Sequence, residues 1–364
     1  METPAPVPAS APAPALESSI APHLRQEGRA PRHRPGTYEP PYPSFSARFG
    51  TQVTAVVMAY FGVQARDPGH PAVTAALSGL RQQFAATDGP ACWDRARYVD
   101  AQGYTTTISI AYWDDPASFR GWYSAHGAAW LDPSRSPAGP GFFLELVTPS
   151  AERFETIFSS PDRVEGVTGA AAGFSGMIEE HGYWGSMRDR LPLSQTSPLY
   201  PAGSPTVTVE GPVRTVVLPE NACLIRSGQD ITDTGDRERQ LYLADVEPSL
   251  RAGMDFLRDD GLSIGCYDNR YLVVLDGDDQ PTDRTFGLSW WRDLSALEDW
   301  AASHPTHVQI FGAAMRHLSS FGPETRLRLY HEVTVPAATE QQFVYVGCHD
   351  QTGLLRAAPP GARS

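Results

Sequence analysis

The sequence contains no lysine, and all 29 of its basic side chains are arginines. Enzymes that form a Schiff base need a lysine amine, and a Walker-A nucleotide site needs a lysine for its phosphates. Both classes are therefore excluded. The dinucleotide fingerprint G-x-G-x-x-G is also absent, so a Rossmann-type dinucleotide site receives no support.

Cysteine and long apolar runs are scarce as well. The four cysteines are far apart and form no C-x-x-C pair, which favours reduced thiols over a disulfide framework or a zinc knuckle. No apolar run reaches about 18 residues, so no membrane span is expected. The first residues lack the apolar segment of a signal peptide, which predicts a cytoplasmic location. The formal net charge of −13 argues against a nucleic-acid partner.

The organisation of the chain follows from composition. Residues 1–15 form a Pro/Ala tail that is expected to be disordered, and residues 16–50 are rich in Pro and Arg, typical of an extended arm. Ordinary folded sequence begins near residue 51. It divides into a first half at 51–200 and a second half at 201–355, followed by a flexible tail at 356–364.

The two halves contain a repeat. Tyr112-Trp113-Asp114-Asp115-Pro116 resembles Trp290-Trp291-Arg292-Asp293-Leu294, and a tryptophan follows at Trp122 and at Trp300. In each copy a strand ends in an aromatic pair, a turn carries Asp, and a helix begins. Further strands are expected at 52–61, 142–148, 213–218, 222–227, 266–275 and 327–335, and further helices at 71–86 and 245–260.

Each half therefore follows the order strand, helix, strand, strand, helix, strand. This pattern predicts a pseudo-symmetric α+β protein of two tandem βαββαβ units whose antiparallel sheets join into a barrel.

Residues 303–335 contain four of the ten histidines. Pro305 suits the first turn of a helix, on which His307 shares a face with Phe311, Ala314 and Leu318. In the following strand, alternation places His331 on a buried face. Each histidine has two interpretations: a core histidine bonded to a carbonyl, or a ligand or catalyst at a shared cavity.

The repeat helps to distinguish these interpretations. At the same offset, His304 corresponds to His126, whereas His307 corresponds to Ala129. A histidine present in both copies fits a role in the scaffold, so His307 is the better functional candidate. Ser227 follows an apolar run and precedes glycine, which fits either a turn-capping serine or a functional hydroxyl at a strand end. Residues 173–200 are irregular and rich in aromatic, Gly and Arg residues, typical of a functional loop.

The motifs HGYWGSMRDRLP, LIRSGQD, AGMDFLRD, SHPTH and LYHEV occur in order, and together they resemble the aldoxime dehydratases, haem b lyases that convert R–CH=N–OH to a nitrile and water. The resemblance covers about residues 17–355. It implies a fold of tandem ferredoxin-like repeats that form a dimeric α+β barrel flanked by helices. It implies His307 as the axial ligand of the haem iron, Ser227 and Arg190 on the distal side, His331 as acid/base, and Glu155 as the residue that orients it.

The resemblance also implies the chemistry and assembly. The substrate nitrogen would bind ferrous haem, the axial histidine would tune the iron, and His331 would protonate the departing hydroxyl. A small-molecule aldoxime and a homodimer are the expected partners. Three alternatives remain at this stage: a haem peroxidase related to chlorite dismutase, a hydrolase with a Ser227–His331–Glu155 triad, and a non-catalytic haem-binding protein.

Overall fold

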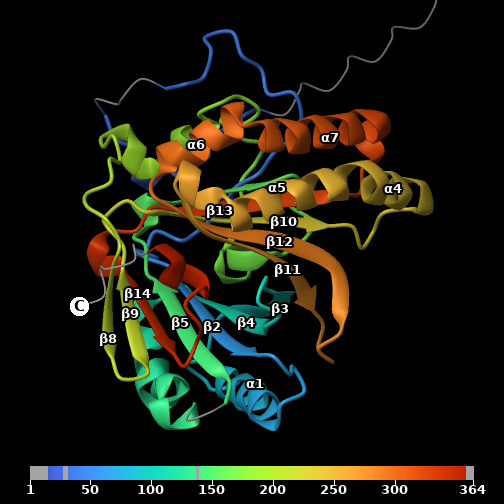
Figure 1. Cartoon of the computed structure of the whole chain (residues 1–364). Helices are drawn as coiled ribbons and strands as arrows, with labels where there is room; N and C mark the ends of the chain where they lie inside the picture. The colour runs from blue at the N-terminus through green and yellow to red at the C-terminus, as the bar shows by residue number, and fades with distance from the viewer. Residues whose placement is uncertain (1–14, 28–31, 137–138, 358–364) are drawn as a thin grey trace, which may run out of the picture.

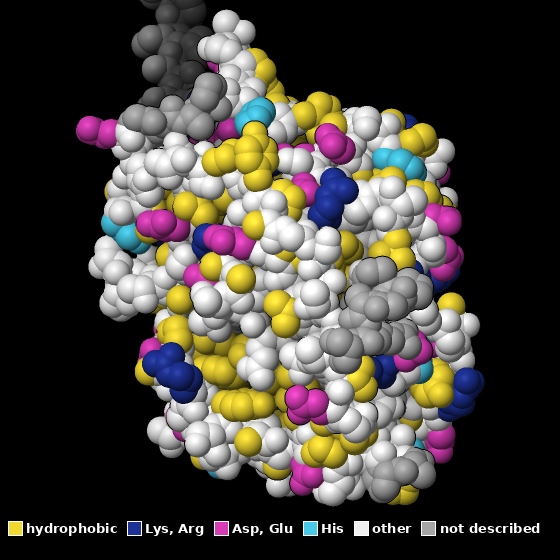
Figure 2. Space-filling model, turned by 60° about the vertical axis from the view of Figure 1, so that its left-hand side comes forward, with side chains coloured by type: hydrophobic (Ala, Val, Ile, Leu, Met, Phe, Trp, Pro, Cys, Tyr) yellow, Lys and Arg dark blue, Asp and Glu magenta, His cyan; other side chains and the backbone are white. Residues whose placement is uncertain are grey.

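A computed structural model describes residues 15–27, 32–136 and 139–357 of the chain. The predicted tails at 1–15 and 356–364 therefore lie almost wholly outside the described residues. Within the described part, no helix has both the length and the apolar character needed to cross a bilayer. On the face drawn in Figure 2, acidic and arginine side chains are dispersed and form no continuous basic stripe.

Twelve strands form one large sheet in which all pairings are antiparallel. Their order across the sheet is β6 (Phe154–Phe158), β13 (Arg328–Thr334), β10 (Cys223–Asp230), β12 (Pro281–Trp291), β11 (Cys266–Leu275), β3 (Cys92–Val99), β4 (Thr105–Trp113), β2 (Val57–Ala65), β5 (Gly141–Val147), β14 (Gln341–Val346), β9 (Val213–Val217) and β8 (Thr206–Glu210). Within the described chain β6 and β8 remain edges, so the sheet is not closed. A separate pair joins β1 (Ala47–Arg48) to β7 (Gly173–Phe174).

Helices cover the two ends of the molecule (Figure 1). The second half of the sheet is covered by α4 (Asp236–Leu241), α5 (Glu247–Asp259), α6 (Leu294–Ser303) and α7 (Pro305–Phe321). The first half packs on α1 (Pro71–Phe84) and α2 (Pro116–Trp122) at the opposite end. The short α3 (Ser186–Arg190) lies in the irregular segment predicted at 173–200.

The repeat has the same local structure in both halves. Asp115 caps the N-terminus of α2 by accepting from Ala117 N, and Asp293 caps α6 by accepting from Ala296 N. Each aromatic pair divides between two cores because neighbouring strand residues point to opposite faces. Tyr112 and Trp290 enter the inner core that joins the halves, whereas the tryptophan after each packs under the helices: Trp113 and Trp291.

Within each half, the four repeat strands have one lateral order. In the first half β5, β2, β4 and β3 are neighbours, and in the second β13, β10, β12 and β11 are neighbours. If the four strands of each half are numbered along the sequence, they lie side by side in the sheet in the order 4-1-3-2. Strands of the two halves also pair with each other: β6 pairs with β13, and β14 pairs with β5.

Three expectations need correction. The strand expected at 52–61 runs instead from Val57 to Ala65, because Val53 N donates to Gly50 O and closes a turn before it. Strand β10 does not stop at Ser227 but continues to Asp230. Gly228 is required there because a Cβ would lie 2.1 Å from Cε1 of Tyr330, so this glycine allows close packing and makes no turn.

The third correction concerns α7. Its most buried residues are Ala313 and His317, whereas Phe311 on the predicted apolar face is 38% exposed. The helix packs closely on α5, where a Cβ on Gly253 would lie 2.4 Å from Cδ1 of Ile310. This contact turns the Ile310 side of α7 toward α5. The face that carries His307 is left partly open.

Candidate active site

The helix-covered face of the second-half sheet contains a group of half-buried residues. Residues near its centre are only half-buried: Ile225, Ser227, Tyr271, Thr285, Leu329 and His331. Helix α7 lies over this face, since Ile310 shares a core cluster with Ile225 and Ala313 shares another with Leu329. A mid-sheet face under helices is normally packed as densely as the rest of the core. The partial exposure therefore distinguishes this part of the sheet from the rest of the core.

Ser227 and His331 are direct partners across β10 and β13. Both side chains point toward the helix-covered face, because they alternate with inner-core residues along their strands. Among the described residues, no hydrogen bond joins the Ser227 hydroxyl to His331. This arrangement gives no support to the Ser227–His331–Glu155 hydrolase triad, which requires the nucleophile to bond to its base.

Glu155, Arg190 and His331 form one hydrogen-bonded cluster. Arg190 Nε lies 2.7 Å from Glu155 Oε2, and Arg190 Nη2 lies 3.1 Å from Glu155 Oε1. His331 Nε2 lies 2.8 Å from Arg190 Nη2 and 3.1 Å from Glu155 Oε1. The structure thus brings together three of the residues expected at the distal site. His331 is less buried than its strand pattern suggested, with 23% of its side chain exposed.

The charges in this cluster are mutually stabilising. Burial alone raises the pKa of Glu155, but the Arg190 guanidinium and His331 outweigh it and hold the pKa below its ordinary value. Glu155 is therefore an ionised carboxylate at neutral pH. Since the Glu155 and Arg190 side chains are each only 1% exposed, their attraction is weakly screened by solvent.

Arg190 reaches this position from the last residue of α3. Its Nη1 donates to Glu180 O at 2.7 Å and to Ser186 Oγ at 3.3 Å. Including the contacts to Glu155 and His331, every terminal nitrogen of the guanidinium has a partner. The irregular loop at 173–200 therefore positions Arg190 at the edge of the sheet, beside Glu155 of β6.

His307 fits an axial ligand of a haem iron. Burial lowers the pKa of His307 and the Ala301 backbone offsets this only in part, so the imidazole is neutral at pH 7, the form that binds iron. Its Nδ1 is buried and has no hydrogen-bond partner in the described chain. A metal would therefore be bound through Nε2.

The surroundings of His307 favour a flat aromatic cofactor over a bare ion. Trp300 lies 4.6 Å from the His307 ring, and Trp184, which is 51% exposed, lies 6.2 Å away. In the described chain, no group of three or more His, Cys, Asp or Glu side chains is arranged to hold a metal ion. A haem iron takes four nitrogen ligands from its porphyrin, so a single histidine of the protein would be enough to hold it.

His304 has a structural role. Its side chain caps α7 by accepting from Thr306 N, and its ring stacks on Phe256 at a centroid distance of 4.3 Å. His126, at the same offset in the first half, lies within the helical turn Tyr123–Gly127 and packs near Trp122 instead.

Sequence reasoning missed two buried polar groups near the site. Glu332, beside His331 on β13, points into the inner core, where Tyr112 Oη donates to its Oε1 at 2.9 Å. His317 on α7 lies 3.4 Å from Glu238, which also accepts from the backbone N of Arg326 and Leu327 ahead of β13. Alternation along β13 suggested Glu332 as an outward residue, and only the inner core, which joins distant strands, buries it.

A G-x-S-x-G stretch does occur, at Gly261–Gly265, but it is not a nucleophile elbow. It forms a 3₁₀ turn between α5 and β11 instead of a strand-to-helix turn. Its serine, Ser263, donates to Asp260 O at 2.7 Å as a turn-stabilising hydroxyl.

Comparisons with known proteins agree with this geometry. Residues 59–354 match the family model described as haem-containing dehydratase. The chain is 41% identical to the aliphatic aldoxime dehydratase of Rhodococcus erythropolis over 350 residues, which cover 94% of this chain and 98% of that protein. It is 32% identical to the phenylacetaldoxime dehydratase of Bacillus sp. (strain OxB-1) over 333 residues, 89% of this chain and 94% of that protein.

A solved structure extends the similarity to the fold. The crystal structure of an aldoxime dehydratase in complex with butyraldoxime superposes with a TM-score of 0.91 at 40% identity, covering 96% of this chain and 99% of that one. The resemblance read from the sequence is thereby confirmed, as are the expectations of an enzyme and of haem as its cofactor. The chain belongs to the haem-containing dehydratase family, whose characterised relatives are aldoxime dehydratases.

Proposed function

We propose that this chain dehydrates aldoximes to nitriles and water at ferrous haem b, with His307 as the axial ligand and His331 as the acid/base. The observation that carries the proposal is the position of His331 Nε2 between a carboxylate and a guanidinium on the open sheet face under α7. When bound, ferrous haem supplies an electron-rich iron that weakens an N–O bond. The steps below concern what the side chains contribute.

The two partners of His331 Nε2 suit two protonation states. Arginine has no acceptor, so Arg190 Nη2 donates only to an unprotonated Nε2. The Glu155 carboxylate, in contrast, accepts only from a protonated Nε2. The same nitrogen therefore has a good partner whether or not it carries a proton, and the anionic Glu155 stabilises the imidazolium.

The other ring nitrogen of His331 faces the substrate in this proposal. No hydrogen bond to Nδ1 is found in the described part of the chain, and the ring is partly exposed. As imidazolium, His331 gives its Nδ1 proton to the oxime oxygen, which leaves as water with the electrons of the N–O bond. The neutral ring, with its Nε2–H held by Glu155, then accepts the aldoxime C–H proton at Nδ1, and those C–H electrons complete the C≡N bond. One proton is given and one returned, so the imidazolium is regenerated.

Ser227 and Arg190 orient the substrate. The Ser227 hydroxyl is directly across the strand pair from His331, at the position from which it can bond to the oxime hydroxyl. Once Nε2 of His331 is protonated, Arg190 Nη2 can no longer donate to it and becomes available for the departing oxygen. Arg190 remains charged throughout and supplies positive potential without giving up a proton.

Two related functions use the same geometry. A haem peroxidase would use Arg190 to polarise peroxide, and a haem carrier would need only His307. The test is anaerobic turnover of butyraldoxime by the haem-loaded protein in its ferrous and ferric states, with butyronitrile measured by gas chromatography. We expect nitrile from the ferrous protein alone. Peroxide-dependent dye oxidation by the ferric protein, with no nitrile from the ferrous protein, would support the peroxidase instead.

We also propose that each half is a ferredoxin-like unit, residues 51–200 and 201–355, and that the two units share the one open sheet. The identical lateral order of the four repeat strands in both halves supports this division. We further propose a homodimer, for which light scattering should give twice the chain mass of 39.6 kDa. A cytoplasmic location is proposed from the four free cysteines.

A further inference from the structure

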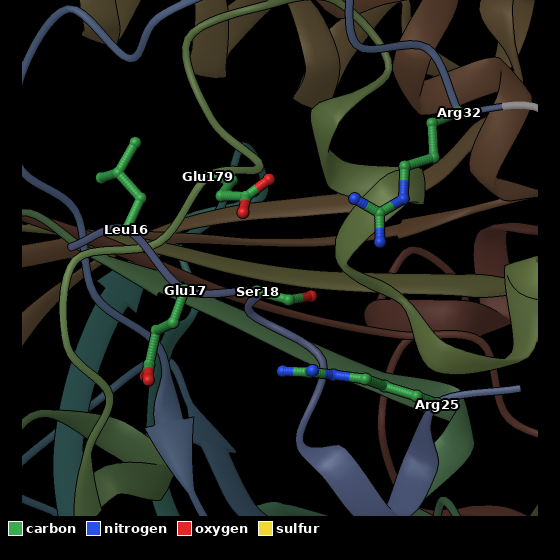
Figure 3. Close-up of a pocket in the computed structure, with 6 residues that line it drawn as sticks. All are labelled: Leu16, Glu17, Ser18, Arg25, Arg32 and Glu179. Atoms are coloured by element: carbon green, nitrogen blue, oxygen red, sulfur yellow. The ribbon is translucent and has the colours of Figure 1, made fainter.

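Two stretches of the N-terminal arm (residues 16–50, described except for 28–31) lie against the loop that delivers Arg190. A small pocket at their junction is lined by residues of both: Leu16, Glu17, Ser18, Arg25, Arg32 and Glu179 (Figure 3). Arm and loop meet there largely through charged and hydroxyl side chains. The position of one relative to the other thus depends on a few directional polar contacts.

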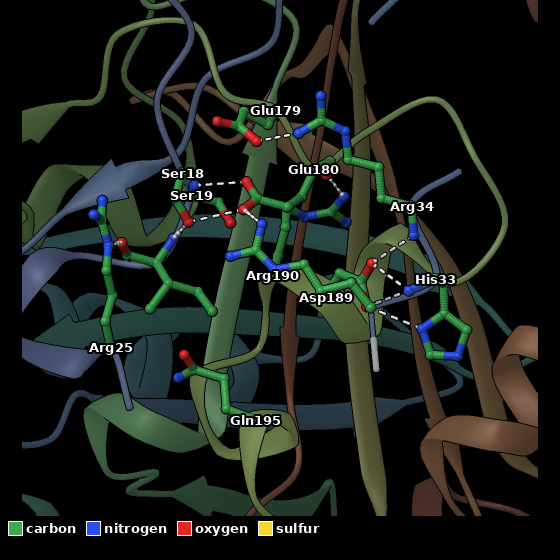
Figure 4. Close-up of polar contacts among 12 residues, drawn as sticks. Ser18, Ser19, Arg25, His33, Arg34, Glu179, Glu180, Asp189, Arg190 and Gln195 are labelled. Carbon is green, nitrogen blue, oxygen red and sulfur yellow. Dashed lines mark hydrogen bonds and ion pairs between the residues drawn. The ribbon is translucent and has the colours of Figure 1, made fainter. Parts of the chain in front are cut away.

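The first contact involves Glu180, whose carboxylate is fully buried. It accepts from Ser18 Oγ and from Ser19 N, each at 2.8 Å (Figure 4). The backbone of the same residue is the acceptor for Arg190, since Glu180 O lies 2.7 Å from Arg190 Nη1. The arm therefore holds Glu180, whose backbone oxygen accepts the hydrogen bond from Arg190 Nη1.

The second contact involves Asp189, the immediate neighbour of Arg190 in α3. Its carboxylate accepts from His33 N at 2.9 Å, Arg34 N at 3.2 Å and Tyr183 Oη at 2.9 Å, and it pairs with His33 Nδ1 at 2.9 Å (Figure 4). Helix α3 has five residues and no side-chain cap at its start. A helix of this length does not hold itself in place, so its direction depends on these partners.

The third contact involves the turn that follows Glu180. Tyr38 Oη donates to His181 O at 2.8 Å. Gly182 has a φ of +78°, and a Cβ there would lie 2.2 Å from Tyr38 Oη, so the arm approaches the turn as closely as glycine allows. The Tyr42 ring lies 5.1 Å from the His181 ring, which is buried with both nitrogens unpaired among the described residues.

From these contacts we propose that the N-terminal arm contributes to the active site by positioning Arg190. Asp189 is the main residue through which the arm does so. The inference rests on the proposed function, because Arg190 matters only if His331 and the substrate need it. Arg190 Nη2 lies 2.8 Å from His331 Nε2, and from this position it is proposed to reach the departing oxygen. A displacement of about 1 Å at such a group can cost roughly 10²-fold in rate.

The test compares Asp189→Asn with Glu17→Gln as a matched control. Each removes one carboxylate charge from the contact between arm and loop. Glu17 binds Arg48 and Gly176 N, and neither touches Arg190. We expect Asp189→Asn to lower kcat by about 10-fold or more while KM changes by only a few-fold. Haem content should be unchanged in both variants, and Glu17→Gln should retain the wild-type kcat.

A second readout separates positioning from general stability. The C–O stretching frequency of the ferrous carbonyl complex rises when a distal positive charge moves away from the bound CO. Asp189→Asn should raise it and Glu17→Gln should not. Tyr38→Phe, which removes only the bond to His181 O, should shift kcat and the frequency in the same direction by less. Tyr38→Phe also serves as the test variant if Asp189→Asn does not fold.

If Asp189→Asn or Tyr38→Phe lowers only the melting temperature, with kcat and the C–O stretch both at wild-type values, the arm merely stabilises the fold and the inference is overturned. If the wild type itself makes no nitrile in its ferrous state, the proposed function fails first. The two failures are therefore distinguishable.

Discussion

Ser227 and His331 stand directly opposite each other in the β10–β13 pair, and both point to the sheet face under α7. The pairing places the hydroxyl proposed to orient the substrate beside the imidazole proposed to exchange protons with it. Because cross-strand partners are fixed by backbone hydrogen bonds, the distance between these groups changes little when a loop moves. Arg190 and Glu155 join them from two further segments, and His307 lies on the helix above.

The first prediction concerns haem attachment. His307→Ala should lose haem, because the neutral imidazole is removed from the open face of α7. His304→Ala should retain it and show only the cost of a lost helix cap, about 1 kcal/mol of unfolding free energy. Pyridine-haemochrome content measures the first effect and urea unfolding the second. Full haem occupancy in purified His307→Ala would rule out the assignment.

The second prediction concerns Glu155. Glu155→Gln removes the carboxylate that stabilises the His331 imidazolium, and kcat should fall by roughly 10²-fold. The variant also leaves the Arg190 charge buried without its counter-ion, which should cost about 3 kcal/mol of unfolding free energy.

Glu145→Gln provides the control for that variant. Glu145 is fully buried and paired with Arg270, in the inner core away from His331. Because Arg270 keeps Asp268 as a partner, this variant should lose less stability, and it should retain its kcat. Equal losses of kcat in both variants would mean that Glu155 acts only through the fold.

The third prediction is a dependence of stability on pH. Burial raises the pKa of Glu332 from 4.5 to about 7, with Arg226 and Tyr112 opposing the rise. A carboxyl with a raised folded pKa stabilises the fold fully below its unfolded pKa and loses that contribution as the pH rises through the folded pKa. The difference between the two pKa values corresponds to about 3 kcal/mol.

Glu332→Gln tests this account because its amide stays neutral. Between about pH 5 and about pH 8, the wild type should lose more unfolding free energy than the variant. Urea titrations at each pH measure the difference between the two proteins, so titration of other groups largely cancels. Parallel pH curves for wild type and variant would contradict the burial of a neutralised Glu332.

The fourth prediction separates orientation from proton transfer. Ser227→Ala removes one hydrogen bond to the substrate and should lower kcat by about 10-fold, less than removal of the acid. Ser227→Thr, which retains a hydroxyl and suits a strand, should keep more activity than the alanine variant. A loss in Ser227→Ala as large as that in His331→Ala would give the serine a share in the proton transfer itself.

Local sequence patterns predicted the elements well where the cause was local. Asp115 and Asp293 indicated helix starts, and their side chains do cap α2 and α6. Pro305 indicated the first turn of α7, and the helix begins there. The repeat suggested that His304 and His307 differ, and the structure makes His304 the N-cap of α7. The family and its cofactor followed from several short motifs in order.

Features that depend on distant segments could not be predicted in this way. Gly228 resembled a strand end, but it is demanded by the ring of Tyr330 on another strand. Glu332 alternates with His331 and would be expected to point outward, but it points into the inner core, where Tyr112 donates to its carboxylate. The arm around His33 and Tyr38 looked like extended coil, and nothing local indicated that it would contact the loop carrying Arg190.

The most direct test of the account is His331→Ala. The imidazole sits between Glu155 and Arg190 at the centre of the proposed proton transfers, yet it is partly exposed and lies outside the inner core. The variant should therefore keep its haem, its Soret band and the spectral shift on binding butyraldoxime, while kcat in the ferrous state falls at least about 10²-fold. Turnover within a few-fold of the wild type by a folded variant that binds butyraldoxime would contradict His331 as the acid/base.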